Sequence, residues 1–235
     1  MIFKDISFDS LLDNVYFDEV LFRLVEKGDI QKDVLRFWES KEYGIVLGRG
    51  SKVEEDVFSH IKKSKKIKVL RRCSGGGTVL QGPGCLNYCI IMNKLNNNNL
   101  SNLNSSYKFI SEKIIFALKK LNVNAIFYPI SDIALCESNK KISGNAQRRG
   151  RKCFLHHGTL LYDFDLSLIG KYLKMPKDVP NYRQQRDHKD FVSNIIPKVT
   201  AKELKNSIAG VFDIDEVVSD ISAEEDSELS KVCIK

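Results

Sequence analysis

The sequence has no apolar run long enough to cross a membrane, and its six cysteines form no C-x-x-C pair. Its first residues, MIFKDISFDS, lack a basic stretch followed by an apolar one, and they are not arginine-rich and acid-free. These absences argue against a secretion signal, a transit peptide and a disulfide framework. A zinc site would lack two ligands even if Cys85 and Cys89 faced one side of a strand. We therefore expect a cytoplasmic protein with reduced thiols and no membrane contact.

The 235 residues are 43% hydrophobic and 29% charged, which suffices for one large core. The formal net charge of +7 is uneven, because residues 213–235 carry eight acids and two lysines and the remainder carries +13. A basic body is typical of proteins that bind nucleic acid, phosphorylated ligands or an acidic partner, or it is simply a solvated lysine-rich face. The basic stretches lack interleaved aromatic residues, which argues against nucleic acid.

Apolar periodicity predicts helices and strands in succession along the chain. We expect helices at 9–27, 51–65, 107–123, 165–173 and from about 199, and strands at 34–40, 43–49, 66–72, 86–92, 124–128, 131–136, 140–146 and 153–161. The asparagine-rich stretch 93–106 is typical of a surface loop, and we assign it no function. This succession predicts an α+β fold with mixed or antiparallel sheets flanked by helices.

The segment RRCSGGGTVLQGPG, residues 71–84, joins two expected strands. It is neither a Walker loop, because no G-K-[ST] closes it, nor a G-x-G-x-x-G turn. An ordered triple glycine costs stability unless the backbone must approach something closely. With the fixed charge of Arg72 beside it, the segment favours a loop around a ligand with anionic oxygens, whereas a plain hairpin bulge would need only one glycine.

A second unusual stretch is KKISGNAQRRGRKCFLHHGTLL, residues 140–161. Its small residues 143–146 predict close packing against something planar. His156 and His157 alternate across an expected strand, so at least one faces the interior or a cleft. A structural and a functional role remain open for both, and no metal-ligand spacing is present.

Taken in order, R-R-x-S-G-G-G-T-V, G-x-L-N-Y, K-I-S-G-x-A-Q-R and H-H-G-T-L-L resemble the lipoate–protein ligase family. That family belongs to the wider group of biotin ligases and of lipoyl or octanoyl transferases. RFW, YGIVLGR and SDIAL also stand in the expected order, and the resemblance covers about residues 10–196. It implies a catalytic domain of the biotin/lipoate ligase fold and a single catalytic domain over 1–235, with an acidic tail at 213–235.

The resemblance implies an ATP-dependent ligase that uses Mg²⁺, activates lipoate or octanoate as acyl-AMP and transfers the acyl group to a lysine. The expected acceptors are lipoyl domains of 2-oxoacid dehydrogenase subunits or the glycine cleavage H protein. Lys141 would be catalytic, and residues 177–194 would be either a mobile cover over the adenylate or a polar surface loop. The implied acyl-binding loop comprises Arg72, Ser74, Gly75, Gly76, Gly77 and Thr78. The implied adenylate-binding residues, with no fixed protein metal site, are Asn87, Asp132, Ser143, Gly144, Ala146, His157, Gly158, Thr159, Arg183 and Arg186.

Three departures from the family pattern keep alternatives open. Residues 154–232 contain no cysteine, and an ATP-independent transferase from acyl carrier protein would need Cys73 or Cys153 as its nucleophile. We expect no large C-terminal accessory domain, and therefore either a separate accessory subunit or a compact enzyme. Ser131 stands where asparagine is common. A non-catalytic binder of lipoylated protein is disfavoured by the intact Lys141, and biotin ligation by SKVEED after GRG.

Overall fold

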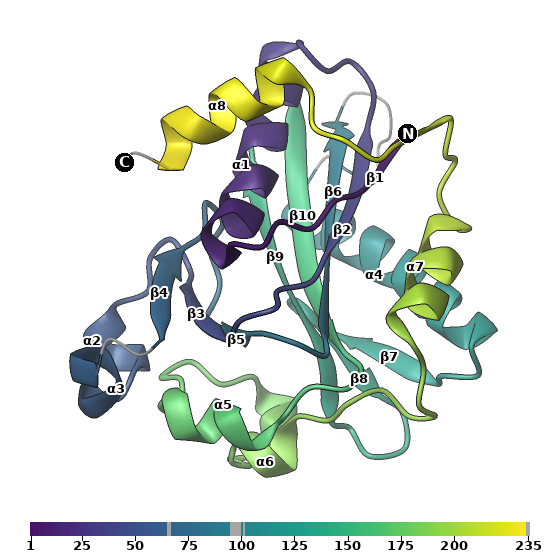
Figure 1. The fold of residues 1–235 in the computed structure, drawn as a ribbon. Helices are drawn as coiled ribbons and strands as arrows, with labels where there is room; N and C mark the ends of the chain where they lie inside the picture. Colours follow the sequence, from purple (N-terminus) through teal and green to yellow (C-terminus); the bar gives the residue numbers. More distant parts are fainter. Residues whose placement is uncertain (65–66, 95–99, 101, 234–235) are drawn as a thin grey trace.

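The computed structural model describes residues 1–64, 67–94, 100 and 102–233 (Figure 1). Its helices are α1 (Leu11–Lys27), α2 (Val53–Asp56), α3 (Ser59–Ser64), α4 (Leu103–Lys120), α5 (Ser167–Tyr172), the 3-10 turn η3 (Asn181–Arg183), α6 (His188–Phe191), α7 (Ala201–Ala209) and α8 (Ala223–Cys233). Its strands are β1 (Ile2–Asp5), β2 (Val34–Trp38), β3 (Gly44–Leu47), β4 (Lys68–Arg71), β5 (Val79–Gln81), β6 (Cys85–Asn93), β7 (Ala125–Tyr128), β8 (Asp132–Leu135), β9 (Lys141–Arg149), β10 (Cys153–Leu161) and β11 (Glu216–Val218).

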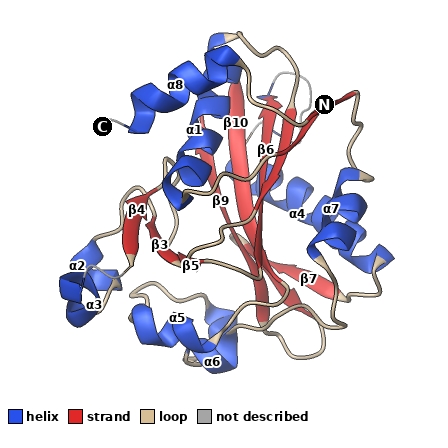
Figure 2. Cartoon of the chain, in the orientation of Figure 1, coloured by secondary structure: helices blue, strands red, loops and turns tan. Residues whose placement is uncertain are grey.

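Two sheets organise the chain. The larger has the strand order β11-β1-β2-β6-β10-β9-β8-β7, and the smaller has the order β4-β3-β5. In the larger sheet β1 runs parallel to both β2 and β11, while the other neighbours are antiparallel. The prediction of an α+β fold with mixed sheets flanked by helices is therefore confirmed (Figure 2).

Strand alternation decides which helices cover which face of the larger sheet. On β6, Tyr88 and Ile90 face one core with α4 and α7, whereas Cys89 and Ile91 face a second core with α1 and α8. Both faces are thus buried, which agrees with the burial of every residue from Cys85 to Ile91 on β6. The smaller sheet packs with α5 and α6 around a third core. A cavity lies between this part of the molecule and strands β9 and β10 of the larger sheet.

The expected helix over 51–65 is wrong in part. It divides into α2 and α3, because Val57 is extended and forms an isolated bridge to Leu173. Residue 65 lies outside the described residues. The expected loop over 93–106 also lies partly outside them, and it is wrong for 103–106, where Asn102 caps the start of α4.

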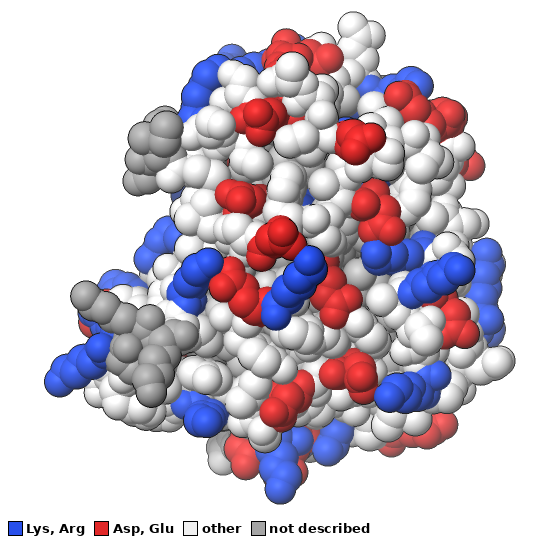
Figure 3. All heavy atoms as spheres, in the orientation of Figure 1, with Lys and Arg blue, Asp and Glu red and all other residues white. Residues whose placement is uncertain are grey.

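The acidic segment at the C-terminal end contributes two elements that the sequence analysis did not predict. β11 extends the larger sheet beside β1, and α8 packs on α1. Glu225 of α8 reaches Lys4 at 3.0 Å, and both side chains are almost fully buried. None of the described helices is both long and apolar enough to span a bilayer. On the face drawn in Figure 3, basic and acidic side chains intermingle and form no continuous basic patch.

Candidate active site

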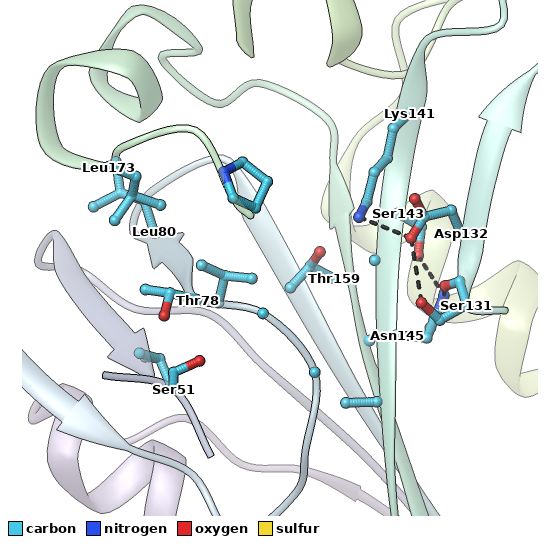
Figure 4. A pocket seen from close by; sticks show the side chains of 18 of the residues that line it. Ser51, Thr78, Leu80, Ser131, Asp132, Lys141, Ser143, Asn145, Thr159 and Leu173 are labelled. Atoms are coloured by element: carbon cyan, nitrogen blue, oxygen red, sulfur yellow. Dashed lines mark hydrogen bonds and ion pairs between the residues drawn. The ribbon is translucent and has the colours of Figure 1, made fainter. Parts of the chain in front are cut away.

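A cavity of about 1420 Å³ opens between the smaller sheet, strands β9 and β10, and residues 173–192. Figure 4 shows Thr78, which directly precedes β5, and Leu80 of β5 across the cavity from Thr159 and Lys141. Of the residues singled out from the sequence, those that line it are Arg72, Gly75, Gly76, Gly77, Thr78, Asn87, Asp132, Lys141, Ser143, Gly144, Ala146, His157, Gly158, Thr159 and Arg183. Ser74 lies just behind this lining, and Arg186 lies outside it.

The glycine loop between β4 and β5 is held from within by Arg72. Its buried guanidinium donates to the carbonyl oxygens of Gly75 at 2.5 Å and Gly77 at 2.8 Å, and to Ser74 Oγ at 3.0 Å. Burial lowers the pKa of Arg72 to about 10, so it remains charged near neutral pH. Gly76 has a φ of +80°, which favours glycine, and a Cβ on Gly75 or Gly77 would meet only open space. The loop therefore presents bare backbone to the cavity.

His157 faces the cavity and joins the glycine loop to helix α1. Its Nε2 lies 2.6 Å from Ser74 Oγ, and its Nδ1 lies 3.2 Å from Asp18 Oδ2. Asp18 in turn pairs with Arg36 at 2.6 Å, and both are almost fully buried. Burial alone would raise the pKa of Asp18, but Arg36 and His157 hold it below its usual value. The sequence analysis missed this buried pair, which supports His157 from behind.

Lys141 stands at the start of β9, with its ammonium group in the cavity. Its Nζ lies 2.8 Å from Asp132 Oδ1 on the neighbouring strand β8. A Cβ on Gly144 would come within 2.8 Å of this nitrogen, so the absence of a side chain there gives the lysine its path. Asp132 Oδ2 accepts a hydrogen bond of 2.7 Å from Tyr182. One carboxylate thus holds both the lysine and a hydroxyl from the segment that covers the cavity.

His156, in contrast, is a buried structural residue. Its Nδ1 lies 3.0 Å from Gln147 Nε2, and its Nε2 lies 3.2 Å from Asn145 Oδ1. Burial, and secondarily the adjacent His157, lowers the pKa of His156 to about 3. Asn145 also donates to the Ser131 carbonyl at 2.8 Å, so His156 helps to fix the cavity wall. The two histidines thus lie on opposite faces of β10, with His156 buried in the wall and His157 bordering the cavity.

The arginines of segment 177–194 mostly stabilise that segment. Arg183 stacks 4.4 Å from the Phe191 ring and donates to the Arg186 carbonyl. Arg186 donates to the carbonyls of Arg183, Tyr182 and Asn139. Arg183 still lines the cavity, together with His188.

None of the six cysteines, all of which lie in the described part of the chain, lines the cavity. Burial raises the pKa of Cys73 to about 11 and that of Cys153 to about 12, so both are neutral thiols near pH 7. Cys73 lines a separate pocket of about 430 Å³, in which Arg23 and Arg148 both form ion pairs with Glu19. Among the described residues, no group of three or more His, Cys, Asp or Glu could hold a metal ion.

The chain matches the model of the lipoyl protein ligase A/B catalytic domain over residues 10–213, and it belongs to this enzyme family. The resemblance read from the sequence is confirmed. The chain is 32% identical over 164 residues to the "Probable lipoate-protein ligase A" of Mycoplasma genitalium, covering 70% of this chain and 46% of that protein. It is 27% identical over 222 residues to the octanoyltransferase LipM of Clostridioides difficile, covering 86% and 77%.

Solved structures share the same fold. The bipartite lipoate–protein ligase of Thermoplasma acidophilum, studied with its E2 lipoyl domain, superposes with a TM-score of 0.84 at 23% identity over 99% of this chain and 91% of that one. A lipoate–protein ligase A bound with ATP gives 0.82 at 22% identity over 99% and 94%. The predicted biotin/lipoate ligase catalytic fold is therefore confirmed. The chain spans less than half the length of the Mycoplasma genitalium relative.

Proposed function

We propose that this protein is an ATP-dependent lipoate–protein ligase, which activates lipoate or octanoate as acyl-AMP and transfers the acyl group to a lysine of a lipoyl domain. The observation that carries the proposal is the chemistry of the cavity wall. The described residues that line the cavity include Lys141, with its ammonium group, and no cysteine. A lysine suits a reaction in which negative charge develops on carbonyl and phosphate oxygens, whereas a thioester route needs a reactive thiol.

In this proposal the acyl chain lies along the bare backbone of Gly75 and Gly77, and its carboxyl end points to Lys141. Attack of the carboxylate on the α-phosphate of ATP forms the acyl-phosphate bond and releases pyrophosphate. The acceptor lysine amine then attacks the acyl carbonyl, and AMP leaves. Lys141 stabilises the charge on the oxygens in both steps, an effect worth roughly 10²–10³ in rate. Segment 177–194 excludes water from the mixed anhydride.

The remaining expectations follow from this assignment. Asn87, Ser143, Gly158 and Thr159 line the cavity where the adenylate would bind, and Arg183 would face its phosphates. Mg²⁺ would enter with the triphosphate, because no cluster of three or more His, Cys, Asp or Glu among the described residues could hold a metal ion by itself. A separate accessory subunit is a natural partner, since the similar Thermoplasma acidophilum ligase is bipartite. The acceptors would be lipoyl domains in the cytoplasm.

The test is a mass spectrum of an apo lipoyl domain after incubation with the protein, lipoate, Mg²⁺ and ATP. Acylation that requires ATP would support the ligase and would show that the chain suffices alone. Transfer only from synthetic lipoyl-AMP would indicate that an accessory subunit completes the adenylation step.

The competing function is an ATP-independent octanoyltransferase, which the 27% identity to LipM of Clostridioides difficile favours. It predicts modification from octanoyl acyl carrier protein without ATP. It also predicts loss of activity and of any trapped thioester in Cys73→Ser or Cys153→Ser. ATP-dependent acylation at the wild-type rate in both variants would contradict this thioester route.

A further inference from the structure

Tyr182 connects the segment that covers the cavity to the reactive lysine. It lies in η3, and its hydroxyl donates to Asp132 Oδ2 at 2.7 Å. The other carboxylate oxygen, Oδ1, lies 2.8 Å from Lys141 Nζ. Each oxygen of one carboxylate therefore has its own partner, one from the covering segment and one from β9.

The hydroxyl of Tyr182 is aimed by its ring. The ring stacks parallel on Tyr128 with centroids 4.0 Å apart, and it packs against Phe191 at 5.2 Å. Tyr128 and Asp132 are direct partners across β7 and β8, so the stacking surface and the acceptor belong to one hairpin. Burial, and then the adjacent Asp132, raises the pKa of Tyr182, so its hydroxyl remains a donor at neutral pH.

The same segment is also attached to the backbone of Lys141. Ser193 N donates to the Lys141 carbonyl at 2.9 Å, and Val192 forms an isolated bridge with Lys141. The end of the segment is thus fixed to β9, while Tyr182 fixes its middle to β8. Placement of the segment over the cavity and placement of the lysine are mechanically linked.

We propose that Tyr182 is a positioning residue for Lys141. By binding Asp132 Oδ2 it orients the carboxylate so that Oδ1 holds the ammonium group in the cavity, and it does so only while segment 177–194 lies in place. The lysine is then aligned for charge stabilisation when the cavity is covered and less well aligned when it is open. This inference rests on the proposed ligase function, because it assigns the lysine its role in acyl transfer.

Tyr182→Phe tests the proposal, because it removes the hydroxyl and retains the stacked ring. Transfer from synthetic lipoyl-AMP to an apo lipoyl domain should lose about 10-fold in kcat, with KM for lipoyl-AMP changed less than about twofold. The matched control is Tyr162→Phe. Tyr162 also donates to a carboxylate, that of Glu39 at 2.8 Å, but it does not line the cavity. A wild-type kcat in Tyr182→Phe, or an equal loss in the control, would overturn the proposal.

A double-mutant cycle separates positioning from a direct contact with substrate. If Tyr182 acts only through Asp132, adding Tyr182→Phe to Asp132→Asn should reduce kcat no further. Independent, multiplicative losses would show that Tyr182 acts by another route.

A readout independent of activity distinguishes failure of this inference from failure of the proposed function. Lys141 is only about one quarter exposed, and its acetylation by an amine-reactive ester is measured by peptide mass spectrometry. We expect acetylation several-fold faster in Tyr182→Phe and unchanged in Tyr162→Phe. An unchanged rate in Tyr182→Phe refutes the positioning role, whether or not the wild type transfers a lipoyl group.

Discussion

Acid is expected to destabilise this protein through His156, which is completely buried in β10. A neutral ring accepts a hydrogen bond from Gln147 Nε2 and donates one to Asn145 Oδ1, which satisfies both nitrogens. This tautomer is assigned from the two amide partners, since each amide offers only one suitable atom. A second proton would oppose the N–H groups of Gln147, and the resulting charge would be buried beside two amides, with no ion pair to a carboxylate among the described residues.

The magnitude follows from the pKa of about 3 in the folded protein. An unfolded histidine has a pKa of about 6.5, so the unfolded chain binds the proton first as the pH falls. The contribution of His156 is therefore complete above about pH 6.5 and is lost progressively towards pH 3. At about 1.4 kcal/mol per pH unit, the free energy of unfolding should fall by about 2 kcal/mol between pH 8 and pH 5.

The assay is urea unfolding of the wild type and of His156→Gln at about pH 8, 7, 6 and 5. Glutamine keeps a donor and an acceptor but does not titrate, so the difference between the two proteins isolates His156 from all other groups. The stability advantage of the wild type should shrink by about 2 kcal/mol across this range. Two parallel curves would refute the reasoning.

Three further predictions concern the proposed active site and the charge of the chain. Lys141→Ala should lower transfer by about 10²–10³ without unfolding the protein, and a wild-type rate with circular dichroism unchanged would contradict the assignment. Arg72→Ala removes the donors that hold the carbonyls of the glycine loop, so calorimetry should find lipoyl-AMP bound about 10- to 100-fold more weakly; unchanged affinity would exclude the loop's role. The excess of basic residues before residue 213 should favour an acidic acceptor, so transfer should slow as salt rises from about 50 mM to about 300 mM, and a flat dependence would count against it.

The sequence predicted the long elements well because their apolar periods are unambiguous. The helix over 9–27 and the strands that became β6, β9 and β10 lie close to their expected positions. The short strands β1, β5 and β11 have three or four residues each, too few for a period to stand out. The helix α8 was not predicted, because the last segment is strongly acidic and its apolar positions are few. Leu229 and Val232 of this helix are nevertheless buried.

The sequence indicated the candidate-site residues that line the cavity, but it did not indicate the buried residues that support them. Motif order indicated Arg72, Lys141 and His157, all of which line one cavity. Asp18 and Arg36 were not singled out, although each interrupts an apolar stretch, VYFDEVLF and VLRFW. A charge of each sign inside an expected core is a signal for a buried ion pair, but sequence alone does not show that helix α1 crosses strand β2 at this point.

The elements outside the family match have a practical consequence for anyone who works with a shortened protein. The match covers residues 10–213, whereas β1, β11 and α8 lie beyond it. Trimming to those limits would uncover apolar side chains of α1, including Phe17 and Leu21, and would leave β2 as an edge strand paired only with β6. Such a fragment could retain every residue that lines the cavity and still aggregate during expression, so inactivity of the fragment would carry no information about catalysis.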